Sequence, residues 1–266
     1  MTDRSEVGAQ NTTQSYDPAT YGERIAGVYD DWPRLPATGE RAVEFLAAVA
    51  GRGPILELGI GTGRLALPLA NRGFAVHGID ASPAMVARLR AKPGGERLPV
   101  TMGNFAEMPV SGRFSLIFVA FNTFFGLQSQ EDQVRCFKGV ADHLTDDGAF
   151  VIEAFVPDVS RFTQGQRVAV THLGGDVVHL ECSLHDPVAQ QVHSHQIVIT
   201  DRGVKLYPVD IRYAWPPELD LMARLAGLRL RERWGGWSRE PFGAASGAHV
   251  SVYERAPLGA RRERTP

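Results

Sequence analysis

Apolar positions divide the chain into a first part in which strands and helices alternate and a second part in which strands follow one another. Between Ile55 and Phe155, five short apolar runs are separated by amphipathic stretches. This pattern is typical of βαβ units and predicts a mostly parallel sheet. The predicted strands are Ile55–Leu58, Ala75–Ile79, Leu98–Met102, Leu116–Ala120 and Ala149–Phe155.

Two helices of the first part carry clear sequence signals. Ser82 is a good N-cap and Pro83 a good first residue, so a helix is expected to begin there. The segment Gln130–Leu144 places its apolar residues on one stripe, which predicts a second helix. After it, Asp146-Asp147-Gly148 is expected to turn the chain into the fifth strand.

From about Asp158 onward the pattern indicates strands joined by turns, followed by one helix that ends at Gly227. The predicted elements are strands over Val177–Leu184, Val192–Thr200 and Val204–Trp215, the helix over 216–226, and strands over Arg229–Trp234 and His249–Glu254.

The sequence therefore predicts an α/β fold, a doubly wound Rossmann-like sheet with a helical N-terminal lid and an antiparallel β insertion. The expected divisions are a mobile leader over 1–15, the helical lid over 16–50, the core over 51–157 and 216–257, the insertion over 158–215, and a mobile tail over 258–266.

Composition and charge exclude several classes of protein. The 28 Lys and Arg residues nearly balance 30 Asp and Glu residues, and a net charge of -2 gives no footprint for nucleic acid or an anionic membrane. No apolar run approaches the ~20 residues of a membrane span, and no signal peptide opens the chain. Two cysteines, Cys136 and Cys182, cannot form a disulfide scaffold. We expect a cytoplasmic protein with no nucleic-acid or membrane partner. The sequence leaves open whether the protein forms a homodimer.

The most informative motif is a glycine turn, Gly59-Ile60-Gly61-Thr62-Gly63, directly after the first strand. Glycines are needed where the backbone has positive φ or must touch a ligand. A dinucleotide fingerprint requires G-x-G-x-x-G, whereas here Arg64 stands in place of the third glycine. Glu57, two residues before the turn, is poorly placed beside a diphosphate but suits a cationic ligand with an α-amino group and a sulfonium.

Polar and aromatic residues follow the next two strands at matching places. Asp80 ends the second strand, 21 residues after Gly59, where a carboxylate can accept both hydroxyls of a ribose. Asn104 and Phe105 follow the third strand, where an amide could read an adenine and a ring could stack on it.

These motifs, together with the segment Phe114–Leu127, resemble class I S-adenosylmethionine-dependent methyltransferases in order and spacing. The resemblance covers roughly residues 16–255 and is to the small-molecule branch, which includes natural-product and sugar N-methyltransferases. It implies S-adenosylmethionine as cofactor and a small-molecule methyl acceptor as partner. The cofactor-binding residues that it implies are Tyr21, Tyr29, Glu57, Gly59, Gly61, Asp80, Ala81, Asn104, Phe105 and Ala120.

The acceptor pocket is expected between the lid, the segment Phe121–Phe125, the end of the fifth strand and the insertion. Its aromatic character favours a flat or hydrophobic acceptor of specialised metabolism over a free amino acid. The candidate lining residues are Phe121, Phe124, Phe125, Phe155, Tyr213 and Trp215.

Catalytic residues are harder to place, because methyl transfer from a sulfonium needs positioning more than acid–base help. Related sugar N-methyltransferases have a histidine near Phe125-Gly126-Leu127, where this chain has no titratable group. The remaining candidate bases are Glu153 and Tyr21, and less favourably Glu107. We therefore prefer methylation at carbon or nitrogen, with O-methylation by Glu153 or Tyr21 as the alternative.

A cluster of histidines around Cys182 is the one feature that could suggest a metal site. Strand alternation places Val178, Leu180, Cys182 and Leu184 on one face, which predicts a buried Cys182, while His193 and His195 form a polar face. No metal is therefore expected. An NAD(P)-dependent oxidoreductase and a non-catalytic cofactor-binding subunit stay as alternatives to the methyltransferase.

Overall fold

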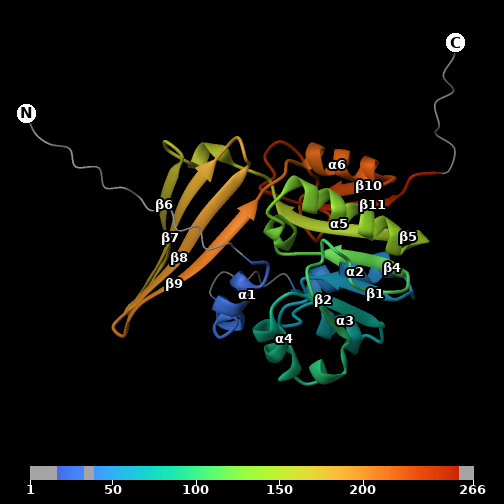
Figure 1. Ribbon diagram of the computed structural model, residues 1–266, viewed down its shortest axis with the longest axis horizontal. Coiled ribbons are helices and arrows are strands. Elements are labelled where there is room, and N and C mark those ends of the chain that lie inside the picture. Colours follow the sequence, from blue (N-terminus) through green and yellow to red (C-terminus); the bar gives the residue numbers. More distant parts are fainter. Residues whose placement is uncertain (1–16, 33–38, 258–266) are drawn as a thin grey trace, which may run out of the picture.

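The computed structural model describes residues 17–32 and 39–257, which form two β-sheets and the helices around them (Figure 1). The polar leader expected over residues 1–15 and the tail expected over 258–266 lie outside the described residues. None of the helices within the described ranges is long and apolar enough to cross a membrane.

The larger sheet has the strand order β10-β11-β5-β4-β1-β2-β3. Strands β1 to β5 run parallel, β11 is antiparallel to β5, and β10 is antiparallel to β11. Because the strand order reverses between β1 and β4, a ligand crevice is expected at the carboxyl ends of these two strands. The strands are β1 (Ile55–Leu58), β2 (Val76–Asp80), β3 (Val100–Met102), β4 (Phe114–Val119), β5 (Leu144–Phe155), β10 (Leu228–Trp234) and β11 (Ala248–Arg255).

Helices cover both faces of this sheet, and each side has its own apolar cluster. One cluster joins the sheet to α2 (Gly39–Ala50) and α3 (Ala66–Asn71). The other joins it to α5 (Gln130–His143) and α6 (Pro216–Leu225). The expected lid over residues 16–50 therefore separates into two parts, because α2 packs in the core.

The local signals for helix ends are confirmed at two places, Ser82 and Gly227. Ser82 caps α4 (Pro83–Arg90) by accepting the Met85 amide at 3.2 Å, and the structure shows a similar cap at Ser129 for α5. Gly227 follows α6 with φ of 75°, a conformation that glycine adopts without strain. The turn expected at 146–148 is instead part of β5, whose pairing with β4 shifts register between Phe114 and Leu116.

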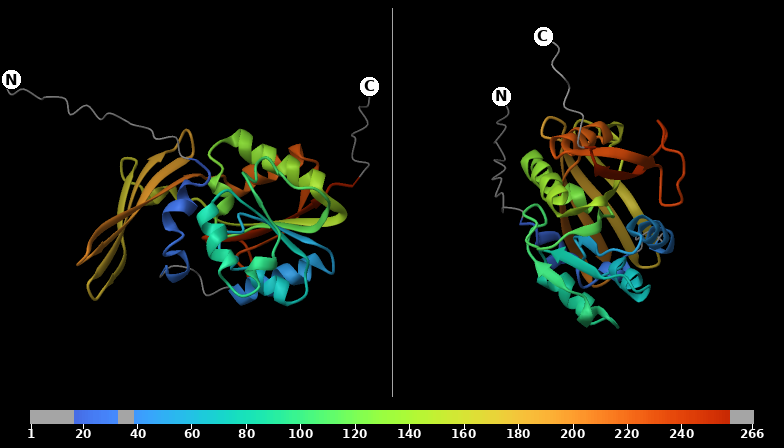
Figure 2. Two further views of the ribbon diagram at one scale, coloured as in Figure 1. Left: turned by 60° about the horizontal axis from the view of Figure 1, so that its bottom comes forward. Right: turned by 90° about the vertical axis from the view of Figure 1, so that its right-hand side faces the viewer.

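The insertion is a four-stranded antiparallel sheet in the order β6-β7-β8-β9. The left view of Figure 2 shows it beside the core, with the N-terminal helix α1 (Thr20–Ile25) against one of its faces. Three of its strands agree with the predicted ones, whereas β6, an edge strand without a fully buried residue, was not predicted. The strands are β6 (Gln166–Gly174), β7 (Val177–Asp186), β8 (Gln191–Thr200) and β9 (Gly203–Arg212).

The two faces of this smaller sheet are the reverse of what its sequence suggests. Its inner face, toward α1 and the core, carries His179, Glu181, Ser183, Val192, Ser194, Gln196, Val198, Tyr207, Val209 and Ile211. Its outer face carries Val168, Val170, Leu173, Val178, Leu180, Cys182, Leu184, His193, His195, Ile197, Ile199, Val204, Leu206 and Pro208. The prediction of a buried Cys182 is wrong: this residue is partly exposed and shares the outer face with His193 and His195. Alternation fixes which residues share a face, but not which face is covered.

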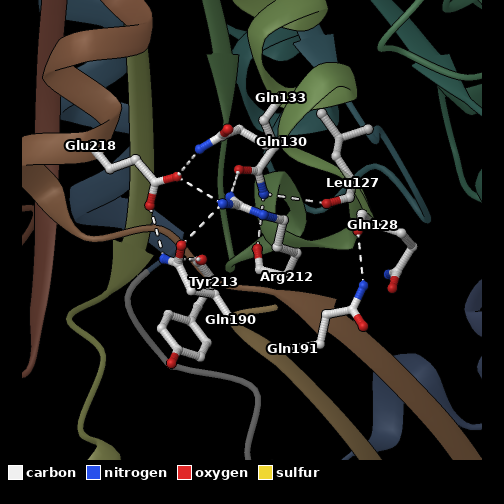
Figure 3. Close-up of polar contacts among 9 residues, drawn as sticks. All are labelled: Leu127, Gln128, Gln130, Gln133, Gln190, Gln191, Arg212, Tyr213 and Glu218. Carbon is white, nitrogen blue, oxygen red and sulfur yellow. Dashed lines mark hydrogen bonds and ion pairs between the residues drawn. The ribbon is translucent and has the colours of Figure 1, made fainter. Parts of the chain in front are cut away.

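A buried polar network joins the smaller sheet to the core (Figure 3). Arg212 at the end of β9 donates to Gln133 of α5 at 2.6 Å, to Gln190 at 3.1 Å and to Glu218 of α6 at 2.7 Å. The side chains of Arg212 and Glu218 are only 7% and 17% exposed, so this ion pair is largely removed from water. The network fixes the sheet against α5 and α6.

The N-terminal segment packs between the two sheets and bonds to the core at two points. Glu23 accepts hydrogen bonds from the Ser82 hydroxyl at 2.7 Å and the Ala84 amide at 2.9 Å. Asp30 accepts from the Thr62 hydroxyl at 2.7 Å and pairs with Lys92 at 2.9 Å. Residues 17–32 therefore form the part of the expected lid that covers the carboxyl ends of the strands.

Candidate functional site

A cavity of about 540 Å³ lies at the carboxyl ends of β1, β2 and β4, between the N-terminal segment and the inner face of the smaller sheet. A volume of this size suits a small-molecule ligand. The structure brings together most of the residues predicted for the site. Those that line the cavity are Tyr21, Tyr29, Glu57, Gly59, Gly61, Asp80, Ala81, Asn104, Phe105, Ala120, Phe121, Glu153 and Phe155.

Four aromatic residues predicted for the acceptor pocket do not line this cavity. Phe124 and Phe125 are fully buried in the core, where Phe124 packs edge-on against Phe137. Tyr213 is buried and shares a hydrogen bond with His185, while Trp215 precedes α6 and is 40% exposed. These predictions are wrong, since an aromatic side chain alone does not distinguish a core position from a pocket position.

The glycine turn after β1 has a backbone that side chains rarely tolerate. Gly59 and Gly61 have φ of 73° and 55°. A Cβ atom on Gly59 would lie 2.5 Å from the Thr123 side chain, so this position excludes any larger residue. The turn thereby brings main chain to the edge of the cavity.

Asp80 is held rigidly at the end of β2. Its two carboxylate oxygens accept hydrogen bonds from the amides of Gly61 at 2.7 Å and Ser82 at 2.8 Å. Burial raises the pKa of this carboxyl group, and the amide hydrogen bonds oppose that change. Each oxygen keeps a further lone pair, so Asp80 can accept from ligand hydroxyls while its orientation is fixed.

Glu57 and Arg64 bring a buried carboxyl group and a buried guanidinium, both with unsatisfied polar atoms, to the cavity. Glu57 Oε2 and both terminal nitrogens of Arg64 are buried without a hydrogen-bond partner. The Arg64 guanidinium lies over the rings of Tyr29 and Phe121, with centroid distances of 5.3 and 4.2 Å. Burial, with Asp80 nearby, raises the pKa of Glu57 well above its ordinary value. Such buried groups call for a ligand, and this pair fits a zwitterion.

Arg64 was missed as a site residue by sequence reasoning. In the sequence it only marks a departure from the dinucleotide fingerprint. Its position directly after the third glycine is the signal that could have placed it in the cavity.

Glu153 holds a strained turn that follows β4. Phe121 and Asn122 have φ of 57° and 63°, which is unusual for residues other than glycine. The Phe121 amide donates to the Glu153 carboxylate, and the Phe155 amide donates to the Asn122 side chain at 2.7 Å. Burial raises the pKa of Glu153, while the amides of Phe121 and Asn122 and the charge of Arg64 oppose the change. Glu153 therefore positions Phe121 at the cavity wall.

Asn104 and Phe105 border the cavity directly after β3. The Asn104 side-chain oxygen accepts the Ala106 amide at 2.9 Å, which leaves the amide nitrogen as the group able to donate to a ligand. Phe105 packs against the main cluster of the core and presents part of its ring to the cavity.

The inner face of the smaller sheet supplies a polar wall that sequence reasoning did not identify. Glu181 pairs with Arg167 and accepts from Gln196 at 2.9 Å, and Ser194 lies on the neighbouring rung. Arg161, from the segment before β6, also borders the cavity. The alternation of polar residues along β7 and β8 could have predicted that these residues share one face of the sheet. It could not predict that this face borders a cavity.

The remaining candidates lie away from the cavity. Glu107 forms an exposed ion pair with Arg135 at 2.6 Å, so it is not placed to act as a base. Within the part of the chain that the structure describes, no three His, Cys, Asp or Glu side chains are grouped to hold a metal ion.

Comparison with known proteins assigns this cavity to a family. Residues 55–148 match the methyltransferase domain family. The structure of the CcbJ methyltransferase from Streptomyces caelestis is 43% identical, covers 91% of this chain and 100% of its own, and superposes with a TM-score of 0.87. The chain belongs to the class I S-adenosylmethionine-dependent methyltransferases.

Two further methyltransferases are similar over nearly the whole chain. The cypemycin N-terminal methyltransferase from a Streptomyces species is 29% identical over 243 residues, which are 90% of this chain and 99% of that protein. CalS10, an amino pentose methyltransferase from Micromonospora echinaspora solved with S-adenosylmethionine bound, covers 86% of this chain and 95% of its own, and shares the fold with a TM-score of 0.64 at 18% identity. This methyltransferase is therefore an enzyme that uses S-adenosylmethionine, which sets aside the oxidoreductase and the non-catalytic subunit.

The cavity of this methyltransferase fits its cofactor chemically. S-adenosylmethionine carries an α-amino group, a carboxylate, a sulfonium and a ribose diol. The unsatisfied atoms of Glu57 and Arg64 match the amino group and the carboxylate, and Asp80 matches the diol.

Proposed function

We propose that this enzyme methylates an amine nitrogen of a small molecule of specialised metabolism. The observation that carries the proposal is the charge of the cavity. Among the described residues, its wall includes the carboxyl groups of Glu57, Asp80, Glu153 and Glu181 but the guanidinium groups of Arg64 and Arg161 alone. Burial raises the pKa of the first three carboxyl groups, so a cationic ligand favours their ionised form and is attracted to them. An amine acceptor arrives largely as an ammonium ion at neutral pH.

In this proposal the cofactor lies along the carboxyl ends of β1, β2 and β3. Asp80 accepts from the ribose hydroxyls, and Asn104 with Phe105 holds the adenine. Gly59 and Gly61 allow close approach of the main chain. Arg64 and Glu57 bind the two charged groups of the methionine moiety. Bound S-adenosylmethionine supplies an electrophilic methyl group on a sulfonium.

The acceptor lies between the N-terminal segment and the smaller sheet. Tyr21 and Phe121 flank the reactive end, and the polar inner face with Glu181, Ser194 and Gln196 contacts the remainder of the molecule. Two similar proteins are named for nitrogen-bearing acceptors, a peptide N-terminus and an amino pentose. Their names support nitrogen over carbon, and the polar wall supports a hydrophilic acceptor over the flat apolar one that the sequence favours.

Methylation of an amine requires little acid–base catalysis by the protein. The ammonium form of the acceptor first loses a proton to solvent, and the neutral amine then attacks the methyl carbon. The carbon–sulfur bond breaks as the carbon–nitrogen bond forms, so that neutral S-adenosylhomocysteine leaves and the methylated nitrogen carries the positive charge until it releases a proton to solvent. Because the Glu153 carboxylate already accepts the Phe121 amide, we assign it to positioning. O-methylation with Glu153 or Tyr21 as base is the second candidate, supported by the raised pKa of Glu153.

The proposal is tested with amine acceptors and their N-acetylated counterparts, both as aminosugars and as short peptides with a free N-terminus. Methyl transfer from labelled S-adenosylmethionine is expected to amines, with kcat/KM rising with pH as the acceptor amine loses its proton. N-acetylation should abolish transfer. Equal transfer to acetylated compounds that keep their hydroxyls would contradict the proposal and favour O-methylation.

A matched pair of variants tests the acceptor wall. Glu181→Gln should raise the KM for the amine about tenfold, with little change in the Kd for S-adenosylhomocysteine, because a charged partner is lost only on the acceptor side. Glu107→Gln, an exposed acid outside the cavity, is the control and should leave both constants unchanged. An unchanged KM in Glu181→Gln would show that this residue of the smaller sheet does not contribute to acceptor binding.

A further inference from the structure

The outer face of the smaller sheet is an apolar surface turned toward solvent. Val168 is 72% exposed, Leu173 75% and Val204 61%, and Val170, Leu184 and Leu206 are also more than half exposed. Strand pairing places these residues with Leu180, Cys182 and Ile197 in one continuous patch across four strands. A monomer rarely exposes an apolar patch of this extent without a partner.

The opposite face of the same strands carries the more polar residues. His179 and Ser183 are 8% and 4% exposed, and Glu181, Ser194 and Gln196 border the cavity. A sheet that simply packs on a core has its apolar face inward and its polar face in water. In this sheet the covered inner face combines those polar residues with apolar ones such as Val192 and Tyr207, whereas the face that meets solvent is largely apolar. In Figure 1 and Figure 2 no described element covers that outer face.

We propose that the outer face is a homodimer interface at which the smaller sheets of two copies stack face to face. A two-fold axis brings the same patch together from each copy, so an apolar sheet face is matched by itself. Two stacked sheets form a β-sandwich with an apolar layer between them, and Cys182 lies within that layer.

The size of the face agrees with a stable dimer. Four strands about 4.8 Å apart and about ten residues long cover roughly 600 Å² on one side. Stable interfaces bury about 800 Å² per partner, and the residues around the rim of the sheet can supply the difference.

The chemistry of the face favours a second copy over other partners. Across its described strands it presents no Lys, Arg, Trp, Tyr or Phe side chain, the types that a membrane-surface site uses. Its two acids at the rim already have partners: Asp210 lies 3.2 Å from His193, and Asp186 accepts the Val188 amide at 2.9 Å, so neither carboxylate calls for a charged partner. The N-terminal residues 1–16 are too polar to cover the face, since their large apolar side chains are just Met1, Val7 and Tyr16.

The native cysteines provide a direct test. Cys136 is fully buried and burial raises its pKa, so a thiol reagent added to the folded enzyme reports on Cys182. The labelling rate of Cys182 should fall at least tenfold as protein concentration rises through the dimer range. Analytical ultracentrifugation over the same range should show a mass of two 29.0-kDa chains. A monomer at all concentrations, with constant labelling, would overturn the proposal.

Variants distinguish a dimer interface from an apolar surface that binds lipid. Val170→Asp with Leu206→Asp places two exposed acids on the face and should raise the dimer dissociation constant at least about a hundredfold, with rapid labelling of Cys182. Leu225→Glu, at a comparably exposed apolar residue on α6, is the control and should leave the dimer intact. S-adenosylhomocysteine should raise the melting temperature of each variant by as much as it raises that of the wild type, which shows that each variant is folded. A dimer that survives the double change, or a monomer that binds phosphatidylcholine vesicles through this face, would contradict the proposal.

Discussion

The two halves that the proposed function gives the cavity, one for the cofactor and one for the acceptor, are built on different physical principles. The cofactor half consists of strand ends in an apolar core, with Asp80 and the glycine turn fixed by main-chain hydrogen bonds. The acceptor half consists of a sheet fixed to the core by a buried network of polar side chains around Arg212. Backbone geometry therefore specifies the first half, whereas a few side chains specify the second.

This difference shows where the enzyme tolerates change. Substitutions in the cofactor half alter a turn whose φ angles allow glycine alone, as at Gly59. Those in the inner face of the smaller sheet alter side chains on regular strands, whose pairing does not depend on them. Cofactor use should thus resist substitution, and acceptor choice should vary independently of it.

Removing the link between the halves should have the largest effect. Arg212→Ala leaves Glu218 and Gln133 buried without their partner, which should lower the free energy of unfolding by about 3–5 kcal/mol. Urea unfolding measures the loss. Arg229→Ala removes an exposed ion pair with Glu254 and should cost less than about 1 kcal/mol. Equal losses in the two variants would show that burial of the network is unimportant.

A second prediction concerns the pH dependence of stability, which arises in the core away from both halves. Burial, with Arg233 nearby, lowers the pKa of His249 to about 4. Since the unfolded side chain titrates near 6.5, the unfolded state binds more protons below that pH, and stability falls as pH drops from about 6.5 to 4. The loss from this residue should approach about 3 kcal/mol.

His249→Phe isolates that contribution. Its free energy of unfolding, measured by urea at several pH values, should fall less steeply below pH ~6.5 than that of the wild type. His172→Gln, at an exposed residue of β6 outside the outer face, should keep the wild-type slope. Parallel curves for the wild type and His249→Phe would mean that other groups cause the acid sensitivity.

The third prediction tests the cofactor half alone. Asp80→Ala should weaken S-adenosylhomocysteine binding by about 1–3 kcal/mol, because a carboxylate that accepts ligand hydroxyls is lost. Titration calorimetry measures the change, and Asp147→Ala, an exposed acid in β5, serves as the control. Unchanged affinity in Asp80→Ala would limit Asp80 to holding Gly61 and Ser82.

The smallest effect is expected where the halves meet. Glu153→Gln keeps an oxygen that accepts the Phe121 amide, so kcat should fall less than tenfold. Glu153→Ala releases the strained turn at Phe121 and Asn122 and should be more damaging. A loss of about 10²–10⁴-fold in Glu153→Gln, with loss of the acidic limb of the pH profile, would identify a general base and favour a hydroxyl acceptor.

The cofactor half could be predicted from the sequence because its signals are local. Strand β1 begins and ends where the apolar run does, and Ser82 caps α4 as expected. Glycine spacing and the residues at successive strand ends are enough to locate the cavity, since parallel strands bring their carboxyl ends together.

The acceptor half was predicted less well because its signals depend on tertiary context. Phe124 and Phe125 are as aromatic as Phe121, but the turn after β4 directs them into the core. Alternation along β7 grouped Val178 with Cys182 correctly and yet could not tell which face meets solvent. Arg64 gained its role only through the neighbours that the fold gives it.

The attachment of the smaller sheet through Arg212 also bears on how new acceptors could be acquired. Positions such as Ser194 and Gln196 face the cavity from strands whose anchorage lies elsewhere, in α5 and α6. A library that randomises these two positions should retain folded, cofactor-competent members at high frequency. After a gene duplication, substitutions on the inner face of the smaller sheet would then change which acceptors are methylated without altering the residues that bind the cofactor.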